Sequence, residues 1–454
     1  MIRSMFKDRI FLSTLMTLGI PVVIQHLFSS FINMVDVVMI GRLGEVSISA
    51  VGLANQLFFV LVLLVYGINS GGAIFVAQFW GSKERLSIHK TVGVSLSISI
   101  AGAFLFTLAA IVLPVLVLSF FTTDSQVVQV GTDYLKIVGW SYVFTAVTFS
   151  FAISSRSVGD AKLPMKASII SLVVNTALNW ILIFGHLGFP ALGVKGAAIA
   201  TVIARFIELS IILVYVFTTD HPLRGTIKGY FSFSRYFVGR VLNKSLPVIA
   251  HEFLWAVGIS LYVAAFARSG TQAYAAYQIA HTIERLFFVG AFGIGSSAAV
   301  MIGNKLGENK REEAILYSRY FNILALACGL FFGVLLMLAA PIFVEAFNVE
   351  PEVKANAVKI MYVVAIYMSL KILNALQVIG TLRGGGDTTY SLFMEISNVY
   401  LIGVPMAFLA AGVWQLPIYI VVALVNLEEV TKAIMGLYRL FSNKWANVVI
   451  EGMS

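Results

Sequence analysis

Three polar side chains lie in segments that are otherwise apolar, and their types suit the binding of a small hard cation. Asp36 lies within the run 31–40, and Asn175 and Asn179 lie four residues apart in a second apolar run. On a helix, that spacing puts both amides on one face. Carboxylate and amide oxygens are suitable ligands for Na⁺, and amides also hydrogen-bond a carboxyl group that carries a proton. We therefore predict a Na⁺ or proton site at these three residues.

Each of these residues also has a structural alternative. Asp36 could be an acid near the edge of a membrane, and the two asparagines could supply hydrogen bonds between helices. A fourth candidate is Glu252, which lies in another apolar segment. Ionisable groups inside a membrane span are costly and indicate function, with a buried ion pair as the alternative for Glu252.

Other charged residues in apolar segments are expected to pair with one another. Arg205 with Glu208, and Glu284 with Arg285, carry opposite charges close together in the sequence, and we favour a structural pairing for both. A larger network between helices is predicted for Lys371, Glu395, Glu428, Glu429 and Lys432, whose roles stay open.

Aromatic residues make up 13% of the chain, so a few of them could line a cavity for a drug-sized molecule. The candidates for a substrate cavity are Met39, Trp140, Trp180, Trp255, Tyr277 and Gln278. For any single aromatic residue, contact with lipid or with the membrane interface is the more common role.

Several enzymatic sites are missing from the sequence. No Gly is followed by Lys, so there is no nucleotide-binding loop of the Walker type. The segment that starts at His251 and Glu252 begins like a zinc-protease motif, but Trp255 occupies the position of the second histidine. We expect no enzyme activity and no cofactor, so uphill transport would depend on an ion gradient.

The composition requires a membrane around this chain. Of its 454 residues, 59% are hydrophobic and only 12% are charged, whereas soluble domains carry about 25% charged residues. A span needs about 20 apolar residues, and inside lipid it must be helical. We predict an all-α protein with twelve transmembrane helices, at about 10–40, 47–80, 90–116, 127–153, 163–185, 192–217, 237–266, 272–304, 314–340, 353–381, 390–412 and 414–440.

The basic residues predict the orientation in the membrane. The net charge is +9, and most Lys and Arg residues fall in the loops that share a side with the N-terminus, which places both termini in the cytoplasm. Because these residues form no runs, they indicate contact with anionic lipid and not with nucleic acid. We expect a monomer in the inner cell membrane.

The two halves of the chain resemble each other. Pro21 corresponds to Pro247 and Pro114 to Pro341, and the segment Arg156-Ser-Val-Gly-Asp corresponds to Arg383-Gly-Gly-Gly-Asp. An even number of helices in each half inserts both halves the same way up, with a substrate cavity expected between the two. The predicted domains are an N-lobe (1–217), a cytoplasmic linker (218–236), a C-lobe (237–440) and a cytoplasmic tail (441–454).

These motifs resemble the multidrug and toxic compound extrusion (MATE) family, in particular its NorM-like bacterial branch. The likeness rests on the segment from Pro21 through Asp36 to Gly41, and on the two Arg-x-x-Gly-Asp segments. It implies a V-shaped, two-lobe antiporter that exports bulky organic cations in exchange for Na⁺ or H⁺.

The resemblance also implies roles for single residues. Asp36, Asn175 and Asn179 match the family's N-lobe cation site, with Thr201 as a weaker match, and Glu252 matches its acid in the seventh helix. NorM-like members often have an aspartate in the tenth helix where this chain has Asn374. One carboxylate of a C-lobe Na⁺ site is therefore missing.

Three other functions stay open at the level of sequence. A flippase for lipid-linked oligosaccharides has the same broad architecture, although Asp36 and the count of twelve helices disfavour it. A membrane-embedded enzyme, such as an intramembrane protease, is another possibility that a zinc assay would test, and Trp255 speaks against it. A uniporter or channel would move its substrate only downhill.

Overall fold

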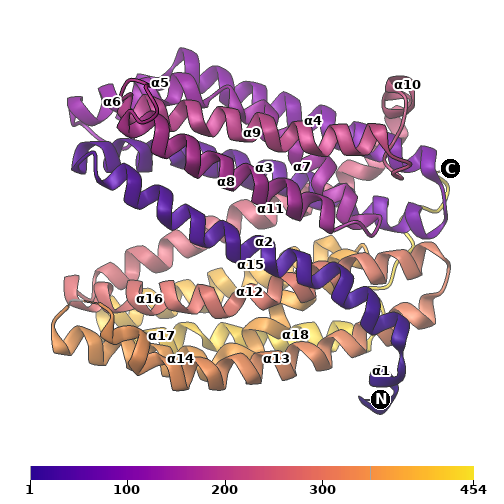
Figure 1. Cartoon of the computed structure of the whole chain (residues 1–454). Helices are drawn as coiled ribbons and strands as arrows, with labels where there is room; N and C mark the ends of the chain where they lie inside the picture. The colour runs from indigo at the N-terminus through magenta and orange to yellow at the C-terminus, as the bar shows by residue number, and fades with distance from the viewer. Residues whose placement is uncertain (1, 348, 454) are drawn as a thin grey trace. The chain divides into compact units, whose positions relative to one another are not determined.

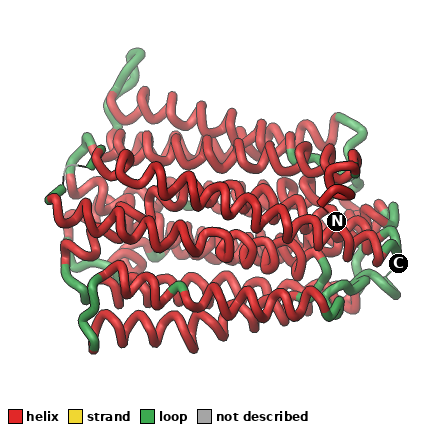
Figure 2. The backbone as a smooth tube through the Cα atoms, turned by 90° about the horizontal axis from the view of Figure 1, so that it is seen from below, coloured by secondary structure: helices red, strands yellow, loops and turns green. Residues whose placement is uncertain are grey.

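The computed structural model describes residues 2–347 and 349–453, and the regular structure in these residues is entirely helical (Figures 1 and 2). The first half of the chain contains α1 (Ile2–Lys7), α2 (Arg9–Gly41), α3 (Glu45–Gly81), α4 (Arg85–Val112), α5 (Pro114–Ser119), α6 (Ser125–Val138), α7 (Ser141–Ser157), α8 (Lys162–Phe184) and α9 (Gly193–Thr218). The short α10 (Ile227–Phe231) comes next.

The second half contains α11 (Arg235–Ala267), α12 (Thr271–Gly307), α13 (Arg311–Glu345) and α14 (Pro351–Ala375). Its last part alternates α-helical and π-helical segments: η1 (Leu376–Leu382), α15 (Thr388–Asn398), η2 (Val399–Gly403), α16 (Val404–Phe408), η3 (Leu409–Val413), α17 (Ile418–Val425) and α18 (Leu427–Phe441).

Ten continuous helical stretches in the described residues are long and apolar enough to cross a membrane by themselves, with α14 and η1 counted as one stretch and α15, η2, α16 and η3 as another. Helices α6 and α7 form an eleventh candidate that bends by 50° between its two parts. The twelfth predicted span is divided into α17 and α18, which Asn426 separates. The helical fold class predicted from the sequence is thus confirmed, and the predicted spans 127–153 and 414–440 are each broken into two helices.

One proline pair of the repeat lies inside a helix in both halves. Pro21 lies inside α2, and its counterpart Pro247 lies inside α11. A proline in a helix removes one backbone hydrogen bond and weakens the helix at that turn. The first long helix of each half is therefore weakened at the same position.

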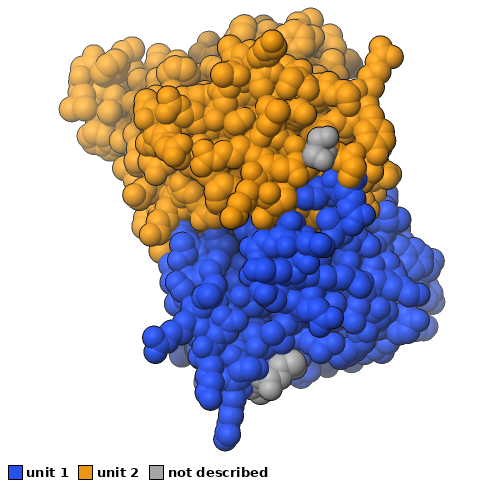
Figure 3. All heavy atoms as spheres, turned by 90° about the vertical axis from the view of Figure 1, so that its right-hand side faces the viewer, with its two compact units in different colours: residues 1–23, 250–451 blue, residues 24–249, 452–454 orange. Residues whose placement is uncertain are grey.

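The chain forms two compact units, which Figure 3 colours separately. Unit 1 contains the described residues up to Val23 together with Ala250–Glu451, and unit 2 contains Ile24–Ile249 with Gly452 and Met453. Helices α2 and α11 therefore each contribute to both units, and each changes unit within a few residues of its proline. The predicted lobes follow chain order. The units differ from them because the start of α2 belongs to unit 1 and the start of α11 belongs to unit 2.

Aromatic contacts hold the exchanged helix ends in their units. In unit 1, Phe11 of α2 packs edge-on against Tyr317 and Phe321 of α13. In unit 2, Phe237 of α11 stacks on Phe79 of α3, with 6.2 Å between ring centroids. The remaining core of unit 2 comes from aliphatic and aromatic residues of α3 to α9, among them Leu135, which is fully buried.

The connection between α9 and α11 packs on unit 2. The Tyr230 hydroxyl donates to the Leu223 carbonyl, and a ring nitrogen of His89 on α4 lies 3.1 Å from the Pro222 carbonyl oxygen. The predicted linker is therefore a folded part of unit 2.

Candidate functional site

The acid and both amides predicted from the sequence meet in unit 2. The Asn179 side-chain nitrogen of α8 donates to an Asp36 carboxylate oxygen of α2 at 3.0 Å and to the Asn175 amide oxygen at 3.3 Å. Asn175 and Asn179 are buried, whereas Asp36 is half-buried. Asn179 is thus the bridge between the acid and the second amide.

Helices α8 and α9 run side by side, and this packing fixes the amide face (Figure 1). A Cβ atom at Gly196 of α9 would lie 2.5 Å from the Leu182 carbonyl oxygen of α8, so only glycine allows this close approach. The i, i+4 spacing on α8 then directs both asparagines to the side where α2 carries Asp36.

Helices α6 and α9 supply three more polar groups around the acid. A side-chain hydrogen bond joins Tyr134 and Thr201, and both Tyr134 and Arg205 interact electrostatically with Asp36. Arg205 also pairs with Glu208 at 2.7 Å, as predicted from the sequence. The site therefore contains carboxylate, amide and hydroxyl oxygens, and a nearby guanidinium whose charge is shared with Glu208.

This set of groups can bind a small cation or a proton. A carboxylate with amide and hydroxyl oxygens can bind Na⁺ directly. The same groups can instead hold a protonated carboxyl group, which donates one hydrogen bond and accepts another.

Glu252 forms a buried ion pair in unit 1. One of its carboxylate oxygens lies 2.7 Å from a guanidinium nitrogen of Arg383 and 3.4 Å from Nδ1 of His251. The buried ion pair, considered from the sequence as the alternative role of Glu252, is therefore the one seen in this structure. A cation that binds Glu252 would have to compete with Arg383.

The repeated Arg-x-x-Gly-Asp segments make matching contacts in the two units. Arg383 contacts α11, and its counterpart Arg156 donates to Gln25 of α2 at 2.7 Å. The arginine in each half therefore contacts the first long helix of that half, α2 or α11.

The aspartates of the same segments contact the C-terminal end of their half. Asp160 lies 3.7 Å from His221, just after α9, and Asp387 accepts a hydrogen bond from Arg439 of α18 at 2.7 Å. In the second half, the indole of Trp445 is fully buried, and a Cβ at Gly385 would lie only 2.4 Å from it. The glycines of this segment thus leave room for the chain after α18 to pack, and the segment has a structural role.

The predicted charge pairings have two different outcomes. Glu284 hydrogen-bonds Lys371 of α14 at 2.5 Å and does not pair with Arg285, whose side chain is exposed. The prediction of a Glu284–Arg285 pair was wrong because adjacent residues of a helix point in different directions. Four members of the predicted network do meet, with Lys432 at 2.8 Å from Glu395, 3.2 Å from Glu428 and 3.7 Å from Glu429. The fifth member, Lys371, forms its ion pair with Glu284 instead.

The residues predicted for a substrate cavity are divided between the units. Met39 packs against the core of unit 2, whereas Trp255, Tyr277 and Gln278 belong to unit 1. Tyr277 packs on Phe266 with 4.6 Å between ring centroids. Trp140 and Trp180, the other aromatic candidates, are exposed in unit 2. Their role as cavity residues stays a prediction.

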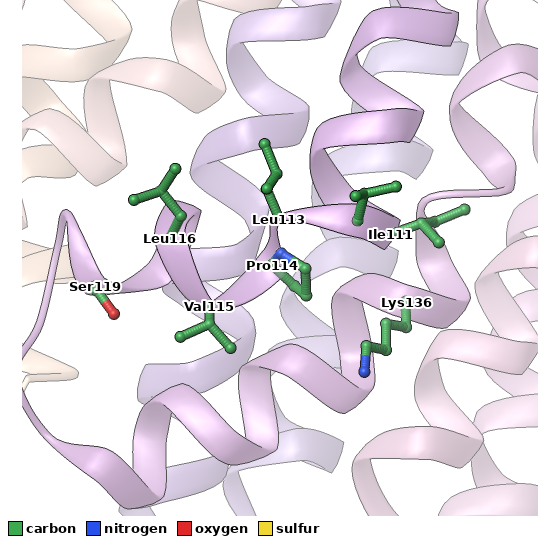
Figure 4. Close-up of a pocket in the computed structure, with 8 residues that line it drawn as sticks. Ile111, Leu113, Pro114, Val115, Leu116, Ser119 and Lys136 are labelled. Atoms are coloured by element: carbon green, nitrogen blue, oxygen red, sulfur yellow. The ribbon is translucent and has the colours of Figure 1, made fainter.

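A pocket of about 540 Å³ lies at the end of α4 and beside α5 and α6 (Figure 4). Lys136 is its only charged lining residue, and the others are mostly aliphatic. None of the residues at the Asp36 site lines it, so we assign it no role in ion binding.

Some residues of the Asp36 site were missed by the sequence analysis. Tyr134 gave no signal because it lies in an amphipathic segment with many polar neighbours. Arg205 was recognised only as a partner of Glu208, since its distance from Asp36 depends on how α9 packs. The partner of Glu252 was also missed, because Arg383 lies far away in the sequence.

Comparison with known proteins identifies the family. The model of the MatE family matches residues 21–181 and, a second time, residues 247–409. The two matched segments begin at Pro21 and Pro247, the prolines paired in the predicted repeat. A single family model that matches twice confirms the duplication.

The relatives agree with this match over most of their length. The chain is 24% identical to the probable multidrug resistance protein NorM of Thermotoga maritima, covering 88% of this chain and 86% of the relative. It is 27% identical to the probable multidrug resistance protein NorM of Agrobacterium fabrum, covering 88% of each.

Solved structures support the same fold. A MATE crystal structure in complex with MaL6 superposes with a TM-score of 0.86 at 21% identity, covering 95% of this chain and 96% of that chain. An outward-facing multidrug resistance MATE transporter gives the same TM-score and coverage. With its duplicated six-helix halves and the family match over both of them, this chain belongs to the MatE family of membrane transporters, the multidrug and toxic compound extrusion proteins, and is NorM-like.

Proposed function

We propose that this protein is a secondary active multidrug efflux antiporter of the cell membrane, with both termini in the cytoplasm. It exports bulky organic cations in exchange for Na⁺ or H⁺. The observation that carries the proposal is the contact of Asp36 with Asn179 and, through it, with Asn175. The multidrug resistance names of the relatives support the choice of cargo.

The position of Asp36 on α2 supports a link between ion binding and the packing of this helix. Helix α2 is weakened at Pro21 and changes units near it, and Asp36 lies in the part that belongs to unit 2. An ion or proton that neutralises Asp36 changes its hydrogen bonding to α8, and with it the packing of α2. Coupling requires that the ion binds one conformation of the transporter more tightly than the other.

Substitution of the acid tests this proposal. Asp36→Asn keeps the shape of the side chain but removes its charge, so we expect ion-driven dye efflux to be lost while the amount of folded protein stays unchanged. Transport is measured in proteoliposomes with an imposed ion gradient.

The matched control is Asp133→Asn, which makes the same substitution in unit 2 at a half-buried residue that pairs with Lys195 at 3.2 Å. This variant should retain efflux. Full gradient-driven efflux by the Asp36→Asn protein would remove the role assigned to Asp36.

A further inference from the structure

A second buried charge cluster lies wholly within unit 1, and the proposed coupling at Asp36 does not use it. The Lys432 ammonium of α18 lies 3.2 Å from Glu428 and 3.7 Å from Glu429 of the same helix, and 2.8 Å from Glu395 of α15. All four side chains are nearly inaccessible, with Lys432 only 3% exposed. We name these four residues the Lys432 cluster.

Neutral hydrogen-bond donors complete the surroundings of two of its carboxylates. The Tyr262 hydroxyl of α11 donates to Glu428 at 2.5 Å, and the Asn374 amide of α14 donates to Glu429 at 2.7 Å. A Cβ at Gly403 would overlap the Tyr262 hydroxyl and a Glu428 oxygen, so glycine at this position keeps room for their contact. The cluster and its two donors therefore come from four helices, α11, α14, α15 and α18.

The charges in the Lys432 cluster do not balance. Three carboxylates surround one ammonium group, so full ionisation leaves two negative charges in excess. The neighbouring charges cannot compensate for them, because Lys371 is paired with Glu284 and Arg383 with Glu252. An excess of negative charge in a dry bundle is unfavourable, and uptake of a proton or a cation removes it.

Two buried acceptor atoms beside the cluster lack a hydrogen-bond donor among the described residues. They are the side-chain oxygens of Asn374, which is 3% exposed, and of Gln377, which is 1% exposed. The Asn374 amide already donates into the cluster, and the Gln377 oxygen faces Gly436 on α18. A protonated carboxyl group is a donor and needs such an acceptor, whereas a carboxylate does not.

We propose that the Lys432 cluster binds an exchangeable proton, held by Glu428 and Glu429, and that the Lys432 ammonium occupies the place that a bound Na⁺ would need. The proton converts one carboxylate to a carboxyl group that donates a hydrogen bond to a neighbouring oxygen. The titratable and charged groups that interact directly with the pair are Tyr262, Lys371, Glu395 and Lys432. Beyond them, His251 and Arg383 interact with Glu395, Glu284 pairs with Lys371, and Glu252 pairs with Arg383. This site would add a second ion to the proposed antiport cycle, but proton binding itself does not depend on that cycle.

Infrared difference spectroscopy of the purified protein in lipid nanodiscs tests the proposal without transport. The C=O stretching band of protonated carboxyl groups is followed as the pH changes, in an Asp36→Asn background that removes the acid of unit 2. We expect a band that disappears as the pH rises and that is lost in the added double variant Glu428→Gln, Glu429→Gln. This double variant leaves Glu395 and Lys432 as a balanced pair, which favours folding.

The matched control is Glu208→Gln in the same background, because Glu208 is equally buried but is balanced by Arg205. Its spectrum should keep the band. The proposal would be overturned if the band survived in the double variant, or if the Asp36→Asn protein showed no such band. Either result would count whatever the outcome of the transport assays.

Two further measurements distinguish a proton from a metal cation and guard against misfolding. Replacing choline by Na⁺ at constant pH and ionic strength should leave the band unchanged, whereas its displacement by Na⁺ would contradict the role given to Lys432. Tyr262→Phe removes one hydrogen bond but no charge, so folding should be preserved. It should move the titration midpoint to higher pH, and an unchanged midpoint would speak against a proton on Glu428.

Discussion

Replacement of Asn179 by leucine probes the site through the residue that joins its parts. The Asn179 amide donates to Asp36 at 3.0 Å and to Asn175 at 3.3 Å, and leucine has a similar volume without polar atoms. The substitution therefore removes one hydrogen bond to the acid without opening a large cavity in a position that is only 2% exposed.

The expected size of the effect comes from that hydrogen bond. A hydrogen bond to a charged group contributes about 1.5–3 kcal/mol, and each 1.4 kcal/mol is a factor of ten in affinity. The half-saturating concentration of the coupling ion should therefore change by roughly 10- to 150-fold.

The direction of the change identifies the ion. If the ion is H⁺, the carboxylate loses a stabilising donor, so the proton binds more tightly and the half-saturating proton concentration falls. If the ion is Na⁺, the site loses an amide oxygen ligand, and the half-saturating Na⁺ concentration rises.

Initial rates of dye efflux from proteoliposomes, measured against pH and against Na⁺ concentration, give both values. The matched control is Asn69→Leu, which alters an equally buried amide of unit 2 that bonds Val65 and Ser99 instead. If Asn179→Leu left the half-saturating concentrations of both ions unchanged, the assignment of this site to ion binding would be refuted.

Three further predictions concern contacts within each unit. Arg383→Leu leaves the buried charge of Glu252 unpaired and should destabilise the protein by about 3–5 kcal/mol. Adding Glu252→Leu should recover most of the resulting loss in apparent melting temperature. No recovery would mean that the two residues do not stabilise each other. Trp445→Ala empties a fully buried site and should cost about 3–5 kcal/mol, with faster trypsin cleavage after α18; unchanged cleavage would contradict the packing described for this segment. Burial lowers the pKa of His221, although the charge of Asp160 opposes this effect. In the unfolded chain a histidine has a pKa of about 6.5. Around that pH, His221 is therefore protonated less often in the folded protein than in the unfolded chain. The free energy of unfolding should therefore fall as the pH drops through that value, and His221→Gln should flatten this part of the profile of melting temperature against pH; an identical profile would count against the buried neutral ring.

The fold was predictable because it depends on local patterns. Apolar segments of sufficient length, separated by short polar loops, require membrane helices, and the paired prolines Pro21 and Pro247 reveal the duplication. The break of the last span at Asn426 and the π-helical segments were not predicted, since composition does not show where a continuous apolar helix changes its hydrogen bonding.

The candidate site in unit 2 was predictable in part. Asn175 and Asn179 share a face by their spacing alone, and an acid in an apolar segment needs polar partners. That Asp36 meets this face depends on the packing of α2 against α8, which no local pattern specifies. The same limit explains why Arg383 was not recognised as the partner of Glu252, and why Glu284 was assigned to Arg285 and not to Lys371.

Sequence patterns also did not predict that α2 and α11 are each divided between the two units. The start of α2 is as apolar as its end, and only tertiary contacts such as that of Phe11 with Phe321 place it in unit 1. Chain order predicts two lobes, but packing decides which helix ends belong to each.

The central claim is that the charge of Asp36 couples an ion gradient to export. The most direct test is dye efflux from proteoliposomes that contain the purified protein, first with an imposed Na⁺ gradient and then with an imposed pH gradient, each for the unmodified and the Asp36→Asn protein. We predict that one of the two gradients drives efflux by the unmodified protein and that neither drives it in the variant. Equal efflux by both proteins under the driving gradient would contradict the coupling role of Asp36.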